Sequence, residues 1–163
     1  MKRILLVAFC SVLGACGFQL RGQASLPFET IYISSPVGHP IGTDLKRLIK
    51  AGTNTRVVDK AKGAQTTLEI ISVVNDKQIM SVSGGGRVRE FELRYRVSFR
   101  LFDAKGVDLI PTNEIALRRI LPYTDAQVVA KEGEEAMLVK EMQTDSAQQI
   151  LRRLEAVKVA ATK

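Results

Sequence analysis

The stretch FELRYRVSFRL, residues 91–101, decides the fold, because apolar and polar side chains alternate in it without a break. The apolar positions are aromatic or aliphatic, and the positions between them carry charges or a hydroxyl group. A period of two places every apolar side chain on one face of a β-strand. We therefore predict a strand of an antiparallel sheet, with one face on a core and the other open to water or a partner.

Two further β-rich runs flank this strand. Upstream lies the run 66–83, followed by Gly84-Gly85-Gly86, a loop in which positive φ is readily adopted. A break in the alternation at residues 75–77 predicts a bulge or a bend in that run. Downstream, the turn sequence at 103–106 leads into residues 107–121, where Pro111 predicts an edge position or an interruption. The centre of the chain is therefore predicted to be a meander of three strands.

The remaining elements complete an α+β pattern. Residues 30–34 read as a short strand, and residues 40–52 as a helix with an apolar stripe. Residues 56–58 are too short to predict more than an extended segment. Residues 126–157 are rich in helix formers, with one predicted sheet-facing stripe: Val129, Ala136, Met137, Lys140, Thr144, Ala147, Leu151 and Leu154. The order lacks repeated βαβ units, so we predict two helices packed on one face of a mostly antiparallel (mixed) four-stranded sheet.

The N-terminus has the pattern of an exported lipoprotein. Lys2-Arg3 precedes a short apolar run, residues 4–13, which is typical of a secretory signal. Leu13-Gly14-Ala15-Cys16 then resembles a bacterial lipobox, which makes Cys16 the lipidated first residue; the alternative is an ordinary signal with a chance cysteine. The predicted organisation is a signal peptide (1–15), a lipidated tether (16–25), a single α+β domain (26–158) and a frayed tail (159–163).

Composition excludes several classes of function. The net charge is +7, and loss of Lys2 and Arg3 with the signal leaves 22 basic against 17 acidic side chains, or +5. A basic surface suits phosphate-bearing partners, and export argues against nucleic acid. The single histidine, His39, and the absence of a thiol after processing argue against a metal site, a cofactor or an enzyme.

Several motifs occur together in a recognisable order. They are the run CGFQLRG at 16–22 directly after the lipobox, Leu26-Pro27, the start of a strand at Glu90-Phe91-Glu92, and the helix segment from Ala130 to Met142. In this order they resemble the lipopolysaccharide-assembly lipoprotein (LptE) family over nearly the whole mature chain. The resemblance implies an outer-membrane lipoprotein that plugs the LptD β-barrel as a heterodimer, assists its folding and helps deliver lipopolysaccharide to the outer leaflet.

The resemblance also implies residues that bind lipopolysaccharide. In the family, binding is associated with basic residues near the loop between the second and third strands and near the start of the long helix. The matching positions are Arg87, Arg89 and Lys131. Glycines 84–86 stand where the family has a basic residue, so Arg87 would act from a shifted position. Guanidinium groups bind the phosphates and carboxylates of such a lipid in a bidentate way.

Two alternatives remain open from the sequence. Arg94, Arg96 and Arg100 are either the solvated face of a strand, paired with neighbouring glutamates, or contacts to the polar lumen of a barrel. At the level of function, the alternative is a periplasm-facing lipoprotein that carries lipid or lipoprotein in its own hydrophobic cavity. The low aromatic content, 6%, with no tryptophan, disfavours such a cavity.

Overall fold

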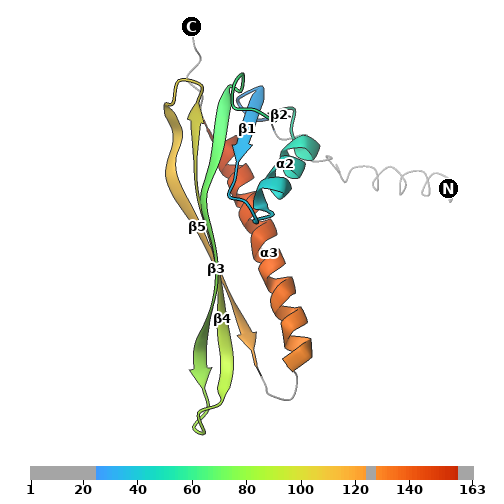
Figure 1. The fold of residues 1–163 in the computed structure, drawn as a ribbon, viewed down its shortest axis with the longest axis vertical. Helices are drawn as coiled ribbons and strands as arrows, with labels where there is room; N and C mark the ends of the chain where they lie inside the picture. Colours follow the sequence, from blue (N-terminus) through green and yellow to red (C-terminus); the bar gives the residue numbers. More distant parts are fainter. Residues whose placement is uncertain (1–24, 124–127, 158–163) are drawn as a thin grey trace, which may run out of the picture.

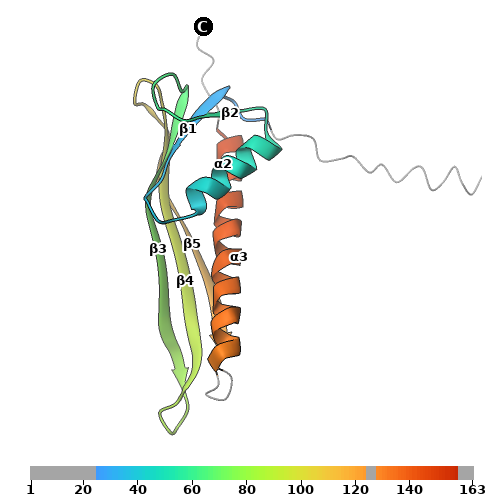
Figure 2. The same ribbon diagram turned by 45° about the vertical axis from the view of Figure 1, so that its right-hand side comes forward.

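Two helices cover one face of a five-stranded sheet in the computed structural model, which describes residues 25–123 and 128–157 (Figures 1 and 2). The elements are, in order, β1 (Thr30–Ser34), α2 (Ile41–Gly52), β2 (Arg56–Val58), β3 (Thr66–Val82), β4 (Val88–Asp103), β5 (Asp108–Pro122) and α3 (Val128–Glu155). The strand order is β2-β1-β3-β4-β5, with parallel pairs around β1 and antiparallel pairs around β4. The α+β class, the helices on one face and the mixed sheet are as predicted.

The strand β4 lies at the centre of the antiparallel meander and confirms the alternation at residues 91–101. Its inward side chains are at most 3% exposed: Leu93, Tyr95, Val97, Phe99 and Leu101. The polar residues between them project from the opposite face, which no element of the described chain covers (Figure 2). One face of the sheet is therefore packed and the other is bare.

The predicted number of strands was too low by one. Arg56–Val58 forms β2, which pairs in parallel with β1 at the edge of the sheet. The backbone N–H of Arg56 donates to the carbonyl of Glu29 (2.8 Å), and the Thr55 hydroxyl donates to the carbonyl of Phe28 (2.8 Å). A three-residue strand has too few positions to show a period, so these hydrogen bonds could not be anticipated from the pattern.

The bulge predicted at residues 75–77 is elsewhere. Those residues pair with β4 in continuous register, whereas the register shifts between Ile70 and Ser72 and again after Ile79. The extra residue, Ile71, is 45% exposed and reverses the phase of the strand. From there on, Val73, Asn75 and Lys77 share the helix side of the sheet with the buried residues of β4.

The strand β5 forms the other edge of the sheet, as Pro111 predicted. Its register shifts between the partners of Phe99 and Leu101, which are Asn113 and Ile110, so Pro111 lies in the irregular stretch. A proline there removes no ladder donor.

The helix α2 packs as predicted, and α3 packs with a different face. Leu45 and Ile49 of α2 are fully buried. The fully buried residues of α3 are Met142, Ser146, Ala147, Ile150 and Leu154. Of the predicted stripe, Ala147 and Leu154 are buried and Leu151 is partly buried, but Ala136, Met137, Lys140 and Thr144 are exposed, and the side chain of Val129 lies outside the described residues. Among the side chains of α3 that the structure describes, the fully buried ones therefore all lie in its C-terminal half.

Candidate functional site

Two of the three predicted binding residues lie at the hairpin between β3 and β4: Arg87 is the last residue of its loop, and Arg89 is the second residue of β4. Arg87 and Arg89 are both exposed, and the loop is held by hydrogen bonds between Ser83 and Arg87, with the Ser83 N–H donating to the Arg87 carbonyl at 2.7 Å. Gly86 has φ of +77°, which explains a glycine at that position. This hairpin lies at one end of the molecule (Figure 1).

The third residue, Lys131, lies near the start of α3 and is engaged in an ion pair. Its ammonium group lies 2.6 Å from a carboxylate oxygen of Glu134, and its side chain is only 17% exposed. To bind an anionic ligand, Lys131 would have to exchange this partner.

The fold brings the loop and the start of α3 to the same end of the molecule. The backbone N–H of Tyr123, just after β5, donates to the carbonyl of Arg89 (2.7 Å). Because α3 starts at Val128, the intervening chain can span at most about 18 Å from Tyr123. Two sites that are some forty positions apart in the sequence are therefore placed at one end, as Figures 1 and 2 show.

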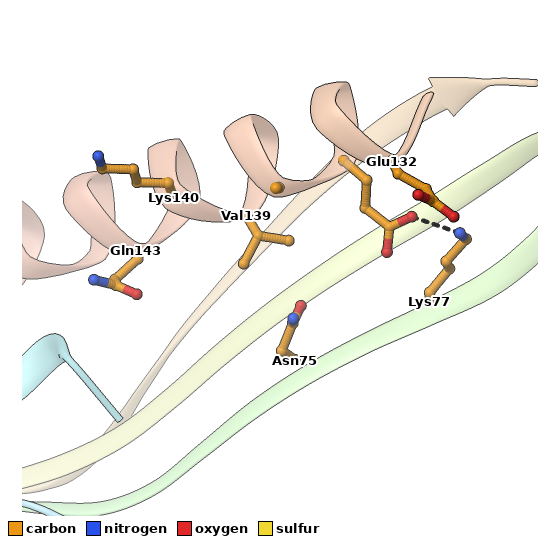
Figure 3. A pocket seen from close by; sticks show the side chains of 8 residues that line it. Asn75, Lys77, Glu132, Val139, Lys140 and Gln143 are labelled. Atoms are coloured by element: carbon orange, nitrogen blue, oxygen red, sulfur yellow. Dashed lines mark hydrogen bonds and ion pairs between the residues drawn. The ribbon is translucent and has the colours of Figure 1, made fainter. Parts of the chain in front are cut away.

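A hollow of about 650 Å³ lies between β3 and the N-terminal half of α3 (Figure 3). Six of the eight side chains that line it are polar or charged, and the other two are apolar: Asn75, Lys77, Glu132, Glu135, Lys140 and Gln143, with Ala136 and Val139. The ammonium group of Lys77 bridges the two elements by an ion pair with Glu135 (2.5 Å). This groove is open at the surface and lacks the continuous aliphatic wall that a lipid chain needs.

An aromatic pair supports the bridging lysine. The ammonium of Lys77 lies 4.3 Å from the ring centre of Phe91, and Phe91 meets Tyr123 edge to face, with ring centres 5.2 Å apart. Sequence reasoning did not identify Lys77. The signal was the polar interruption at residues 75–77, which we interpreted as a bulge rather than as polar residues on the helix side.

The arginines on the bare face of the sheet differ in their pairing. Arg94 and Arg118 lie opposite each other in register and share the carboxylate of Glu92. Arg100 pairs with Glu69 (2.6 Å), whereas Arg96 makes no ion pair within the described part of the chain. Much of this face is thus internally neutralised.

A buried polar group lies on the helix side of β4. Tyr95 is 3% exposed, and its hydroxyl has no hydrogen-bond partner among the described residues. Burial, and secondarily the nearby charge of Asp44, raise the pKa of Tyr95 to about 12. The carboxylate of Asp44 in turn accepts hydrogen bonds from Gln143 and Arg47.

Within residues 25–123 and 128–157, no group of three potential ligands is arranged to hold a metal ion. In the same residues, no helix combines the length and apolar composition needed to cross a bilayer. His39 is exposed in a loop, as predicted.

The fold and these surfaces define a class: a two-layer α+β domain that presents charged surfaces at its ends and on its bare sheet face. The family model described as "LptE: Lipopolysaccharide-assembly" matches residues 28–154, so the chain belongs to the LptE family. An LPS-assembly lipoprotein LptE of Yersinia pestis is 29% identical over 158 residues, which cover 93% of this chain and 74% of that protein. The family is thus defined by a role in assembly.

Solved structures agree with this assignment. A lipoprotein B of Nitrosomonas europaea is 51% identical, with a TM-score of 0.76 over 86% of this chain and 91% of that one. The rare lipoprotein B of Shewanella oneidensis is 24% identical and shares the fold, with a TM-score of 0.68 over 78% of this chain and 94% of that one.

Proposed function

We propose that this chain is an outer-membrane lipoprotein, anchored through Cys16, that plugs the LptD β-barrel as its heterodimeric partner. In this role it assists assembly of the barrel and helps deliver lipopolysaccharide to the outer leaflet. The observation that carries the proposal is membership of the lipopolysaccharide-assembly family over residues 28–154. The charged, internally paired face of the sheet supports it, because a plug meets a polar lumen rather than lipid.

Lipopolysaccharide would be bound by Arg87, Arg89 and Lys131. The exposure of the two arginines, and their placement at the same end as the start of α3, support this assignment. Each guanidinium can form two hydrogen bonds with one phosphate group. Lys131 would contribute less, because it has to leave Glu134 first.

The alternative, a carrier with its own cavity, is disfavoured by two observations. Six of the eight side chains that line the groove of about 650 Å³ are polar or charged. The core is filled by side chains from the sheet and from both helices, among them Phe99, Ile49 and Ile150, each fully buried. A carrier of acyl chains needs an apolar wall instead.

The plug is tested by capturing the full-length lipoprotein from outer membranes in mild detergent, with a high-salt wash. We expect a single large barrel protein in a one-to-one ratio, because an extensive interface resists salt better than surface ion pairs do. Recovery of the lipoprotein alone, carrying bound lipid, would contradict the plug and favour the carrier.

The binding residues are tested by replacing Arg87, Arg89 and Lys131 together with serine. We expect weaker lipopolysaccharide binding by the purified protein, with thermal stability little changed, because Arg87 and Arg89 are exposed and Lys131 has only an i,i+3 ion pair within α3 to lose. The matched control replaces three exposed cations away from the hairpin loop and the start of α3: Arg96, Arg118 and Lys140. Unaltered affinity in the first variant, or equal losses in both, would refute the assignment.

A further inference from the structure

The positive charge of the described chain is concentrated in one segment. Residues 41–63, which comprise α2, β2 and the start of the loop that follows, hold six basic and two acidic side chains, or +4. The remaining described residues hold 13 basic and 14 acidic side chains, or −1. We call residues 41–63 the basic segment; it accounts for the whole net charge of the part of the chain that the structure describes.

The charges of the basic segment are available to a partner. Arg47, Lys50, Arg56, Lys60 and Lys62 are exposed, and Lys46 is partly exposed. Within the described residues, only Arg47 makes an ion pair, with Asp44 (2.9 Å), and its side chain is still 74% exposed. Asp44 also accepts a hydrogen bond from Gln143 of α3, so one of the two acidic side chains is turned toward the core.

The basic segment lies beside the first residues that the structure describes. Leu26 and Phe28 are buried, and the carbonyls of Phe28 and Glu29 accept hydrogen bonds from Thr55 and Arg56. The ten residues from Cys16 to Ser25 can span at most about 35 Å. If Cys16 carries the lipid anchor, the tether joins the domain beside β2 of the basic segment and keeps that segment within reach of the anchored membrane surface.

We propose that the basic segment docks on the anionic phospholipid headgroups of the leaflet that holds the anchor. Phosphate groups complement the exposed lysines and arginines of the basic segment, and the tether keeps that segment close to the surface. Lipid anchor and basic segment would together fix the orientation of the domain before or during its assembly with a partner. This inference uses the anchor of the proposed function but not the barrel or the binding of lipopolysaccharide.

The test places the full-length lipidated protein in vesicles of phosphatidylcholine, with or without phosphatidylglycerol, and no barrel protein. An uncharged amine reagent labels exposed lysines, and mass spectrometry quantifies each site. Labelling of Lys46, Lys50, Lys60 and Lys62 should fall severalfold with phosphatidylglycerol and recover in high salt. Lys77 of β3 is exposed and pairs with Glu135 in the N-terminal half of α3, away from the basic segment, and its labelling should not change.

Two variants separate a specific surface from overall charge. The first replaces Lys50, Lys60 and Lys62 with glutamate and retains Lys46 as the reporter. The second makes the same charge change at Arg96, Arg118 and Lys140, with all four reporter lysines retained. Protection by phosphatidylglycerol should vanish in the first variant and persist in the second.

The outcomes distinguish phospholipid headgroups from a barrel protein as the partner of the basic segment. Equal labelling in the two kinds of vesicle would overturn the proposal, and protection only after a barrel protein is added would assign the surface to that protein instead. If the protein floats only with vesicles that contain phosphatidylglycerol, it lacks a stable lipid anchor. That result would contradict the proposed function while still supporting binding by the basic segment.

Discussion

At the scale of single residues, Tyr95 shows how burial without a partner affects stability. Its hydroxyl is buried beside the charge of Asp44 and makes no hydrogen bond within the described chain. An unsatisfied buried hydroxyl costs on the order of 1–3 kcal/mol of desolvation. The ring, by contrast, fills the core between the sheet and the helices.

Replacing Tyr95 with phenylalanine should therefore leave stability at neutral pH unchanged or raise it by about 1 kcal/mol. Chemical denaturation with urea measures this, and Tyr32→Phe, at a partly exposed position, is the matched control. A loss of more than about 1 kcal/mol at Tyr95 would mean that the hydroxyl has a stabilising partner.

The raised pKa of Tyr95 predicts a specific alkaline dependence. The unfolded tyrosine ionises near pH 10 and the folded one near pH 12, so the unfolded state binds fewer protons between these values. The part of the unfolding free energy that depends on a protonated Tyr95 is fully present below pH 10. It falls by roughly 2–3 kcal/mol as the pH rises to 12. The Tyr95→Phe variant should lose stability less steeply in this window, and parallel curves would contradict the raised pKa.

At the scale of elements, the buried face of α3 could not be predicted from the sequence pattern. Its C-terminal half is buried at Met142, Ile150 and Leu154, but its N-terminal half borders the open groove. Met137 and Met142 are equally apolar in the sequence, yet Met137 is 56% exposed and Met142 is fully buried. A helix rich in alanine and charged residues has no dominant stripe, so the position of the sheet selects the buried face.

Met142→Ala should therefore cost about 2–4 kcal/mol of unfolding free energy, because it leaves a cavity against the sheet. Met137→Ala should cost less than about 0.5 kcal/mol, since the side chain is mainly in solvent. Urea denaturation of both variants is the measurement. Equal costs would support the helix face predicted from the sequence over the one in the structure.

The strands were easier to predict than this helix, for a physical reason. Alternation at residues 91–101 reports burial on one face directly, and Pro111 marks an edge because it lacks a ladder donor. The phase of β3 depends on the single extra residue Ile71, whose apolar side chain carries no signal that it would be expelled. The helix-side position of Lys77 follows from that phase and was missed for the same cause.

The sequence could predict which residues belong to the candidate site but not how their side chains are paired. The sequence indicated Arg87, Arg89 and Lys131 through a family resemblance, whereas the ion pair of Lys131 with Glu134 depends on side-chain geometry in the first turns of α3. The lipid-binding role of these residues stays a prediction until it is tested.

At the scale of the whole molecule, the two ends have different characters. One end carries β2 of the basic segment and the loop that follows it, and the other carries the hairpin loop between β3 and β4 (Figure 1). The strand β3 runs between them, from Thr66 to Val82. If the basic segment faces the anchored leaflet, the hairpin loop points away from it.

Labelling single cysteines in intact cells tests this orientation. Ala61 and Gly85 are exposed, one at each end, and a Cβ added at Gly85 meets nothing within 4 Å. In the proposed plug, a membrane-impermeant thiol reagent should reach Gly85→Cys from outside the cell, and Ala61→Cys only after the outer membrane is permeabilised. The reverse pattern would refute the orientation, and with it the docking of the basic segment.

The length of β3 sets the distance between the two ends of the molecule. Its 17 residues, at about 3.3 Å each, extend for roughly 56 Å. A bilayer with its headgroup regions measures only about 40–45 Å. A domain held at one headgroup layer by its basic end, and standing upright, would thus carry its opposite loop past the far layer. The strand β3 is thus more than long enough to bring the hairpin loop from the anchored leaflet to the outer headgroup layer, where the proposed function requires lipopolysaccharide to arrive.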